Sequence, residues 1–157
     1  MKCYNLIFIT PDLIMMKKSP NPHCPCCSDM DYTHCCKPYH DGLAAPTALA
    51  LMRSRYSAYV LRLTPYLLAT WHPETCPQNL NLNDSIQTKW LGLQIKQYKN
   101  TDPTHAIVEF VARYRIGGEP ASRLHETSQF VLENDRWLYV DALHIDGMHS
   151  EDNSKTL

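Results

Sequence analysis

The spacing of apolar residues changes once along the chain, from a helical period to a strand period. In the stretch that follows the cysteines, apolar side chains recur three and four residues apart and form one stripe, made of Met52, Tyr56, Tyr59, Val60 and Leu63. Thr64-Pro65 then predicts the start of a second helix over YLLATWH, because threonine caps helices and proline suits their first position. A third short helix is expected to begin near Asn83 or Asp84 and to carry Trp90.

From residue 92 onward, apolar and polar side chains alternate. In AIVEFVARYRI one face is made of Ala106, Val108, Phe110, Ala112, Tyr114 and Ile116. The run GLQIKQYKN precedes this strand, and LHETSQFVLE and RWLYVDALHI follow it across turns at Gly117-Gly118 and Asn134-Asp135. Four strands joined by short turns predict an antiparallel meander. Helices followed by such a sheet indicate an α+β fold with the helices packed on one face.

Composition narrows the class of protein. A chain of 157 residues, 44% of them hydrophobic, is long enough for one full domain and a small appendage. Its 15 basic and 16 acidic side chains nearly cancel, which gives no overall attraction to nucleic acid or to an anionic membrane. The basic stretches RSR and KWLGLQIKQYK are too sparse to indicate nucleic-acid binding. No apolar run of the sequence is long enough to span a bilayer.

The two ends of the chain are expected to lie outside the folded unit. Pro11 and Asp12 interrupt the N-terminal apolar run, and no small-residue cleavage site follows, so a secretory signal is not indicated. A Met-Met pair precedes Lys-Lys, so residues 1–16 are expected to be a dispensable or non-native extension, with an amphipathic arm as the alternative. Residues 147–157 are polar and are expected to form a flexible tail. Without an export signal we expect a cytoplasmic protein, in which thiols stay reduced.

Five of the seven cysteines lie in the thirteen residues CPCCSDMDYTHCC. Four of them form two close pairs separated by eight residues, Cys24 with Cys26 and Cys35 with Cys36. Each pair can occupy one edge of a tetrahedron, and zinc prefers four sulfur or nitrogen ligands in that geometry. In the surrounding residues 17–45, apolar side chains follow neither the helical nor the strand spacing. This segment cannot bury enough apolar surface to fold unaided. We therefore predict one structural zinc ion that supplies the missing folding free energy.

Alternatives to this ligand set stay open. His34 could replace Cys35 or Cys36. Cys24 and Cys27 have the C-x-x-C spacing of redox proteins, but the strand–helix setting of such proteins is missing. A redox role would require a labile metal and a reactive Cys27. Unrelated buried cysteines are a poor explanation for five in thirteen residues. In the favoured interpretation, Cys27 is a spare thiol beside a zinc site.

The pattern C-x-C-x8-C-C of residues 24–36 resembles the SEC-C zinc motif, which occurs in the translocase motor SecA and in several small bacterial proteins. Beyond it the chain is similar to YchJ-family proteins, in the runs LMRSRYSAYV, YLLATWHP, VEFVARY, HETSQF and RWLYVDA. Together these runs extend the resemblance from residue 23 to residue 145. It implies an N-terminal SEC-C motif followed by a cone-shaped α+β domain of the nuclear-transport-factor-two-like fold.

Three features depart from the family pattern. SEC-C motifs usually have glycine where this chain has Cys27, and the last strand usually ends in glycine where Ala142 stands. Many relatives carry a second cysteine motif at the C-terminus, which HSEDNSKTL lacks. The first departure leaves the four predicted ligands in place.

The run LHETSQFVL carries two polar side chains on its apolar face, those of Glu126 and Ser128. Cone-shaped domains of this kind often hold a pocket between sheet and helices, where a carboxylate must be paired or hydrated. The candidate neighbours are Arg53, Arg55, Tyr56, Tyr59 and Asp141. These side chains form either a pocket with Glu126 as acid, base or ligand anchor, or a buried network that fixes the helix to the sheet. We favour the network.

Two histidines lie near these elements, and the sequence makes a separate prediction for each. His72, between Trp71 and Pro73, is expected to cap the C-terminus of the second helix rather than to act as a catalyst. His125 lies on the opposite strand face from Glu126 and is expected to be exposed.

The sequence therefore divides into four parts: a possible extension (1–16), a SEC-C-type zinc-binding segment (17–45), a cone-shaped domain (46–146) and a tail (147–157). The resemblance implies a zinc-binding accessory or adaptor protein, because SecA's related motif is associated with contacts to its export chaperone and to ribosomes. The SEC-C segment would contact a protein or ribosomal partner, and the cone domain would be a scaffold or a small-ligand holder. The alternative is a small enzyme that acts on a hydrophobic small molecule through Glu126, with Ser128 or a tyrosine.

Overall fold

The computed structural model describes residues 23–82 and 87–143. The expected extension (1–16) and tail (147–157) lie outside the described residues. Within the described ranges, no helix is both long enough and apolar enough to cross a bilayer.

Short helices come first along the chain and long strands follow. The cysteine-rich segment, whose described part is residues 23–45, contains the 3-10 helix η1 (Tyr32–His34) and α1 (Lys37–His40). The cone domain begins with α2 (Ala48–Leu61) and α3 (Thr64–Ala69) and continues with β1 (Thr88–Asn100), β2 (His105–Ile116), β3 (Ser122–Glu133) and β4 (Arg136–Ala142). The strands are antiparallel in the order β1-β2-β3-β4, so the predicted α+β meander is confirmed.

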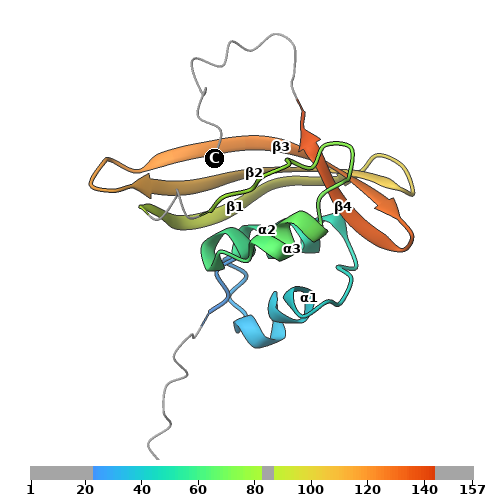
Figure 1. Cartoon of the computed structure of the whole chain (residues 1–157), viewed down its shortest axis with the longest axis horizontal. Helices are drawn as coiled ribbons and strands as arrows, with labels where there is room; N and C mark the ends of the chain where they lie inside the picture. Colours follow the sequence, from blue (N-terminus) through green and yellow to red (C-terminus); the bar gives the residue numbers. More distant parts are fainter. Residues whose placement is uncertain (1–22, 83–86, 144–157) are drawn as a thin grey trace, which may run out of the picture.

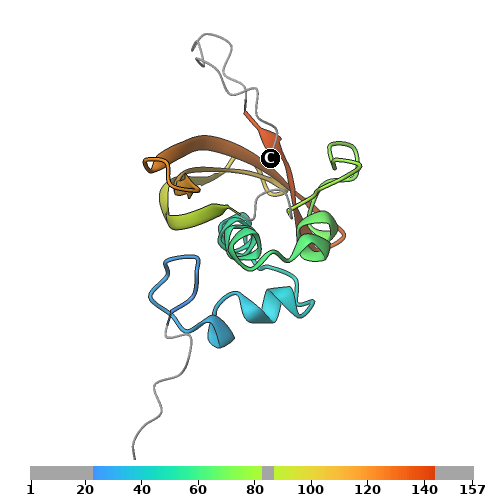
Figure 2. The same cartoon turned by 60° about the vertical axis from the view of Figure 1, so that its left-hand side comes forward.

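The elements form three layers (Figures 1 and 2). Helices α2 and α3 lie against one face of the curved sheet, and the cysteine-rich segment lies on the far side of the helices. Helix α2 is therefore enclosed from both sides, and its buried residues are Ala48, Leu51, Met52, Ser54, Arg55, Tyr56, Ser57 and Ala58. The single apolar stripe expected from the sequence describes only the side that faces the sheet.

Local signals set the ends of α2 and α3. The Thr47 hydroxyl accepts a hydrogen bond from the Ala50 amide at 3.0 Å and caps the start of α2. Arg62 ends α2 in the left-handed region, at φ 58°. The predicted second helix is present as α3, with Pro65 in its first turn. Its N-cap is Leu63 rather than the predicted Thr64, which is the first helical residue, and the helix ends at Ala69 rather than near His72.

The prediction of a third helix that carries Trp90 is wrong in the part that the structure describes. Residues 83–86 lie outside the described residues, but Trp90 belongs to β1. Strand β1 starts four residues before the predicted Gly92, because Thr88 pairs with Ile116 and Trp90 with Tyr114 on β2. A register shift between Trp90 and Gly92 hides this pairing from a simple alternation of side chains.

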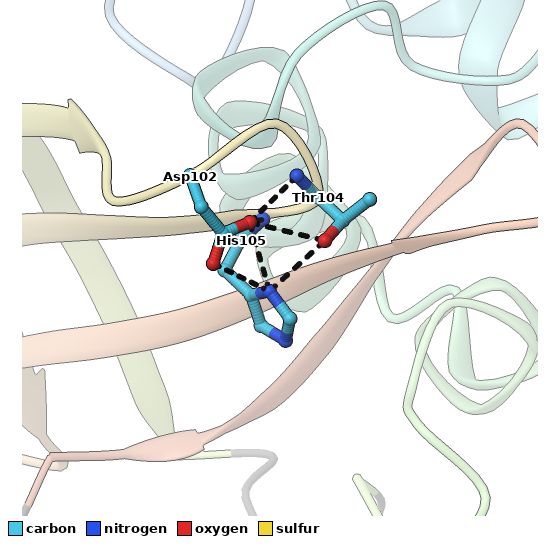
Figure 3. A network of polar contacts seen from close by, with 3 residues as sticks. All are labelled: Asp102, Thr104 and His105. Carbon is cyan, nitrogen blue, oxygen red and sulfur yellow. Dashed lines mark hydrogen bonds and ion pairs between the residues drawn. The ribbon is translucent and has the colours of Figure 1, made fainter.

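The strand connections use residues suited to tight turns. Asn134 and Asp135 both have positive φ, 48° and 59°, which matches the right-handed twist of a two-residue hairpin. Between β1 and β2, the Asp102 carboxylate accepts hydrogen bonds from the amides of Thr104 and His105, each at 2.8 Å (Figure 3). The backbone bond from Thr104 is the main cause that lowers the pKa of Asp102 to about 2. This cluster fixes the turn through its own backbone.

One hydrophobic core joins the cysteine-rich segment to the cone domain. Cys24, Cys26 and Cys36 are buried in the same cluster as Leu51 of α2 and Phe110 of β2. The predicted boundary at residue 45 therefore divides the sequence, but the two parts pack together in one core.

Candidate functional site

Four thiols meet where the cysteine-rich segment packs on α2. The Sγ atoms of Cys24, Cys26, Cys35 and Cys36 all lie within 4.8 Å of one another. Cys35 Sγ is 3.5 Å from Cys26 Sγ and 3.8 Å from Cys36 Sγ. A tetrahedral site with Zn–S bonds of about 2.3 Å would place its sulfurs about 3.8 Å apart. The spacing therefore fits a four-coordinate metal ion, and these four cysteines can hold one.

Crowding and burial oppose ionisation of two of these thiols, those of Cys35 and Cys36, when no cation is bound. Burial raises the pKa of the Cys35 thiol to about 11. The hydrogen bond with the neighbouring Cys24 sulfur is the main cause that raises the pKa of Cys36. A bound dication would replace the thiol protons and compensate the four thiolate charges. The chemistry of the cluster thus suits a metal better than four free thiols.

Helix α2 supports the cluster from behind. The Ser57 hydroxyl donates to Cys36 Sγ at 3.4 Å and lies 3.5 Å from Cys24 Sγ. Arg53, one turn earlier, donates from Nη1 to the Cys26 carbonyl at 3.0 Å. Such contacts fix the orientation of ligands around a metal. Sequence reasoning missed Ser57, although its spacing of four from Arg53 placed both on one side of the helix.

His40 is a second tie between the cysteine-rich segment and α2. Its Nε2 lies 2.9 Å from the Ser54 carbonyl, and its Nδ1 lies 2.8 Å from the Tyr32 hydroxyl. Because a carbonyl only accepts, Nε2 carries the proton and Nδ1 accepts from Tyr32. Burial lowers the pKa of His40, which keeps the ring neutral. Sequence reasoning did not single out His40.

A cavity of about 140 Å³ lies between α2 and the concave face of the sheet. Five of the predicted pocket residues line it: Arg55, Tyr56, Tyr59, Glu126 and Ser128. Most of the remaining lining is apolar or aromatic: Met52, Leu82, Trp90, Phe110, Ala112, Leu124 and Tyr139.

Glu126 is the acidic residue in the described lining of this cavity. Its Oε1 accepts hydrogen bonds from Ser128 Oγ at 2.6 Å and from the Tyr139 hydroxyl at 3.3 Å. Burial, reinforced by the Glu126 charge, raises the pKa of Tyr139, so this hydroxyl keeps its proton and donates. Among the described residues, no ion pair to Glu126 occurs.

Arg55 is held by the protein itself. Its Nη1 donates to the Leu67 carbonyl and to Thr70 Oγ1, both at 2.8 Å. The guanidinium carbon lies 4.8 Å from the Trp71 ring centroid and 4.6 Å from that of Tyr139. Only 3% of the residue is exposed, and this burial lowers the pKa of Arg55. Arg55 therefore anchors α2 to the following chain and to β4.

Comparison with known proteins begins with sequence. The family model described as "YchJ, middle NTF2-like domain" matches residues 47–142. UPF0225 proteins of Xanthomonas oryzae pv. oryzae and Bordetella pertussis are 52% and 54% identical to the chain over 128 and 131 residues. These matches cover 82% and 80% of this chain, and 99% and 97% of the two relatives. The chain belongs to the YchJ-like family.

Solved structures agree with the YchJ-like assignment. A SEC-C motif containing protein from Rhodopseudomonas palustris superimposes with a TM-score of 0.70 at 32% identity, over 79% of this chain and 99% of that one. A second, from Psychrobacter arcticus, gives a TM-score of 0.66 at 30% identity, over 81% and 84% of the two chains. The expected cone-shaped fold with an N-terminal cysteine motif is confirmed.

Cys27, which replaces the usual SEC-C glycine in this YchJ-like chain, lies outside the thiol cluster. Its φ of 59° is in the left-handed region, which glycine enters without strain. The side chain is exposed, and its Sγ accepts a hydrogen bond from the Leu93 amide of β1 at 3.4 Å. His34 is exposed as well, with its ring beside Thr33 rather than beside the four sulfurs.

Two residues predicted for the pocket lie elsewhere in the YchJ-like structure. Arg53 is two positions from Arg55, which is about 200° around a helix, so it faces the cysteine-rich segment. Asp141 is exposed because the β3–β4 register shifts between Ser128 and Phe130. Ser128 pairs with Ala142, so Ala142 takes the cavity side and Asp141 the other side.

Sequence reasoning also missed the aromatic groups around Arg55. Tyr139 alternates with Trp137 along β4, so the period of two could have placed it on the inner face. Trp71 reaches Tyr139 through an isolated bridge after α3, with ring centroids 5.0 Å apart. Nothing in a local pattern indicates such a contact between a loop and a distant strand.

The predictions for the two histidines of the cone domain differ in outcome. The cap interpretation of His72 is wrong, because α3 ends at Ala69 and Thr70 is the C-cap. His72 instead donates its amide to the Tyr139 carbonyl at 2.7 Å, with Nε2 3.4 Å from Glu133 Oε1. His125 is exposed as predicted, and it lies 2.7 Å from Glu109 Oε1.

Proposed function

We propose that this protein is a zinc-stabilised accessory or adaptor protein of the cytoplasm. One zinc ion bound by Cys24, Cys26, Cys35 and Cys36 would fix the cysteine-rich segment against α2. The outer surface of that segment would contact a protein or ribosomal partner, and the cone domain would hold a small ligand. The observation that carries the proposal is the set of four sulfurs within 4.8 Å of one another.

The chemistry of the donor set favours a structural zinc ion. Four sulfur donors suit zinc, and a site closed by four protein ligands leaves no position for a substrate. Cys24, Cys26 and Cys36 are buried, which also shields the site from solvent. Ser57 and Arg53 would orient the ligand loop, while the metal supplies folding free energy that this short segment lacks.

The outer loop of the cysteine-rich segment supports the adaptor role. The residues between the two cysteine pairs include exposed Asp29, Met30, Asp31, Thr33 and His34. Met30 is 49% exposed, and an accessible large apolar side chain on a loop that the metal would fix is suited to a protein contact.

The cavity supports ligand holding better than catalysis through Ser128. Ser128 is completely buried and donates to Glu126, so its hydroxyl is not accessible as a nucleophile. The enzyme alternative would therefore depend on Glu126 alone or on a tyrosine.

Metal analysis tests the zinc half of the proposal. Protein purified under reducing, anaerobic conditions should contain about one zinc per chain, and Cys24→Ser should lose it, because the remaining three sulfurs leave the tetrahedron open. Cys76→Ser is the matched control, since Cys76 lies outside the cluster and should leave the zinc content unchanged. Absence of zinc from the wild type would end the claim.

Affinity capture and ribosome co-sedimentation test the adaptor half. Wild-type protein should retain a specific partner, or sediment with ribosomes, whereas Cys24→Ser should not. Met30→Glu should keep its zinc and lose the contact, which separates loss of the surface from loss of the fold. Equal retention by all three proteins would contradict an adaptor role for this segment.

A further inference from the structure

The cone cavity combines an aromatic wall with polar groups on the sheet. The Trp90 ring forms the centre of the wall, with its centroid 5.6 Å from that of Tyr56 and 6.0 Å from that of Tyr59. Phe110 adds a further ring to the lining, and Glu126 and Ser128 provide polar groups from β3. Such a lining suits a flat, mostly apolar molecule with a polar substituent.

Glu126 offers the cavity an acceptor, Oε2, that no residue in the described part of the chain uses. Ser128 and Tyr139 both donate to Oε1. No group in the described ranges forms a hydrogen bond or ion pair with Oε2. A half-buried carboxylate oxygen gains from a donor that enters the cavity with the ligand, because an unpaired acceptor away from water costs free energy.

The charges of the lining favour a neutral ligand. Arg55 is the one cation and Glu126 the one anion among the described residues that line the cavity, so their charges cancel. An anionic ligand would meet the Glu126 carboxylate. A cationic ligand would meet the guanidinium of Arg55, whose faces are already covered by Trp71 and Tyr139. Either ligand would also lose its hydration without a net opposite charge to replace it.

The cavity volume limits the ligand to one ring. About 140 Å³ is close to the roughly 150 Å³ of an engineered apolar cavity that accepts benzene. It is smaller than the roughly 300 Å³ or more of sites for drug-sized molecules. A single ring with a small substituent matches this space.

We propose that the cavity binds a neutral, single-ring aromatic molecule that carries one hydroxyl or N–H donor. The ring lies against Trp90 and Phe110, and the donor forms a hydrogen bond with Oε2 of Glu126. This proposal rests on the ligand-holding part of the proposed function and names the chemical class of the ligand.

Phenol and toluene are matched probes, because they share the ring and differ in the hydrogen-bond donor. Both are titrated into the full-length, zinc-loaded protein, and the Trp90 indole N–H is followed by NMR. Phenol should bind at least about tenfold more tightly than toluene, and it should shift the Trp90 signal. Benzoate and benzylamine, which carry opposite charges, should both bind more weakly than phenol.

Two substitutions separate the Glu126 contact from general effects on the sheet. Glu126→Gln should weaken phenol binding about tenfold while leaving toluene binding nearly unchanged, because a charge-assisted hydrogen bond becomes a neutral one. Glu109→Gln is the control and should change neither, since Glu109 lies on the other face of the sheet beside His125.

Equal binding of phenol and toluene, tighter binding of benzoate, or an unchanged phenol affinity in Glu126→Gln would overturn the proposal. So would the absence of phenol binding at millimolar concentration. Zinc content is measured on the same samples. A protein with one zinc per chain that does not bind phenol contradicts only this inference. A protein that binds phenol but holds no zinc contradicts only the zinc claim.

Discussion

Cys27 shows how a single backbone angle links the sequence to the ligand loop. A φ of 59° places it in a region that costs a residue with a Cβ roughly 1–2 kcal/mol, and glycine pays no such cost. The glycine of other SEC-C motifs therefore has a conformational reason. In this chain, the hydrogen bond from the Leu93 amide to the Cys27 sulfur offsets part of that strain.

Substitutions at position 27 test this account. Cys27→Gly should keep the zinc and match or exceed the wild type in stability, whereas Cys27→Val should lower the free energy of unfolding by about 1–2 kcal/mol, because β-branched residues resist positive φ. Urea denaturation together with zinc analysis measures both effects. If the valine variant were as stable as the glycine variant, the backbone argument would fail.

His40 makes the attachment of the cysteine-rich segment sensitive to pH. Burial lowers the pKa of His40 below its ordinary value of 6.5, so the folded state binds a proton less readily than the unfolded state. The stability that its neutral ring contributes is present above pH 6.5, and it is lost as the pH falls through the lower folded value.

Melting temperatures at pH 7.5 and pH 5.5 measure this contribution. The wild type should lose more stability on acidification than His40→Gln, which lacks the titrating ring. His34→Gln should follow the wild type, because His34 is exposed and its ring lies beside Thr33 at the surface. If the melting temperatures of the wild type and His40→Gln fell equally between pH 7.5 and pH 5.5, the role given to His40 would be contradicted.

At the scale of elements, the sheet was more predictable than the helices. Alternation placed all four strands, because the residues on the inner face of β2 and β3 are on the whole more buried than the residues between them. The existence of α2 was also predictable, but its burial on both sides was not. Polar Ser54 and Ser57 face α3 and the cysteines, and periodicity assigns such residues to solvent.

Irregular pairing explains why part of the cavity could not be predicted. Glu126 and Ser128 follow the regular alternation of β3, and the structure places both in the cavity lining. The shift in the β3–β4 register turned Asp141 away, and nothing in RWLYVDA indicates where that shift occurs. Trp90 was assigned to a helix because its strand partners lie more than twenty residues away. Long-range pairing overrode the local signal in both cases.

At the scale of the molecule, α2 connects the thiol cluster and the cavity. It contacts the cysteines through Arg53 and Ser57, and it lines the cavity with Met52, Arg55 and Tyr56. Cys24, Cys26 and Cys36 belong to the same hydrophobic core as the sheet. A bound metal would therefore stabilise the packing of α2 as well as the short segment that provides the ligands.

X-ray absorption at the zinc edge tests the central claim most directly, because it reports the ligand atoms around the metal in the intact protein. We expect four sulfur neighbours at about 2.3 Å, provided by Cys24, Cys26, Cys35 and Cys36. A shell that contains nitrogen at about 2.0 Å would show that a histidine takes the place of one cysteine ligand, which contradicts the predicted ligand set. A sample without zinc would contradict the zinc site itself.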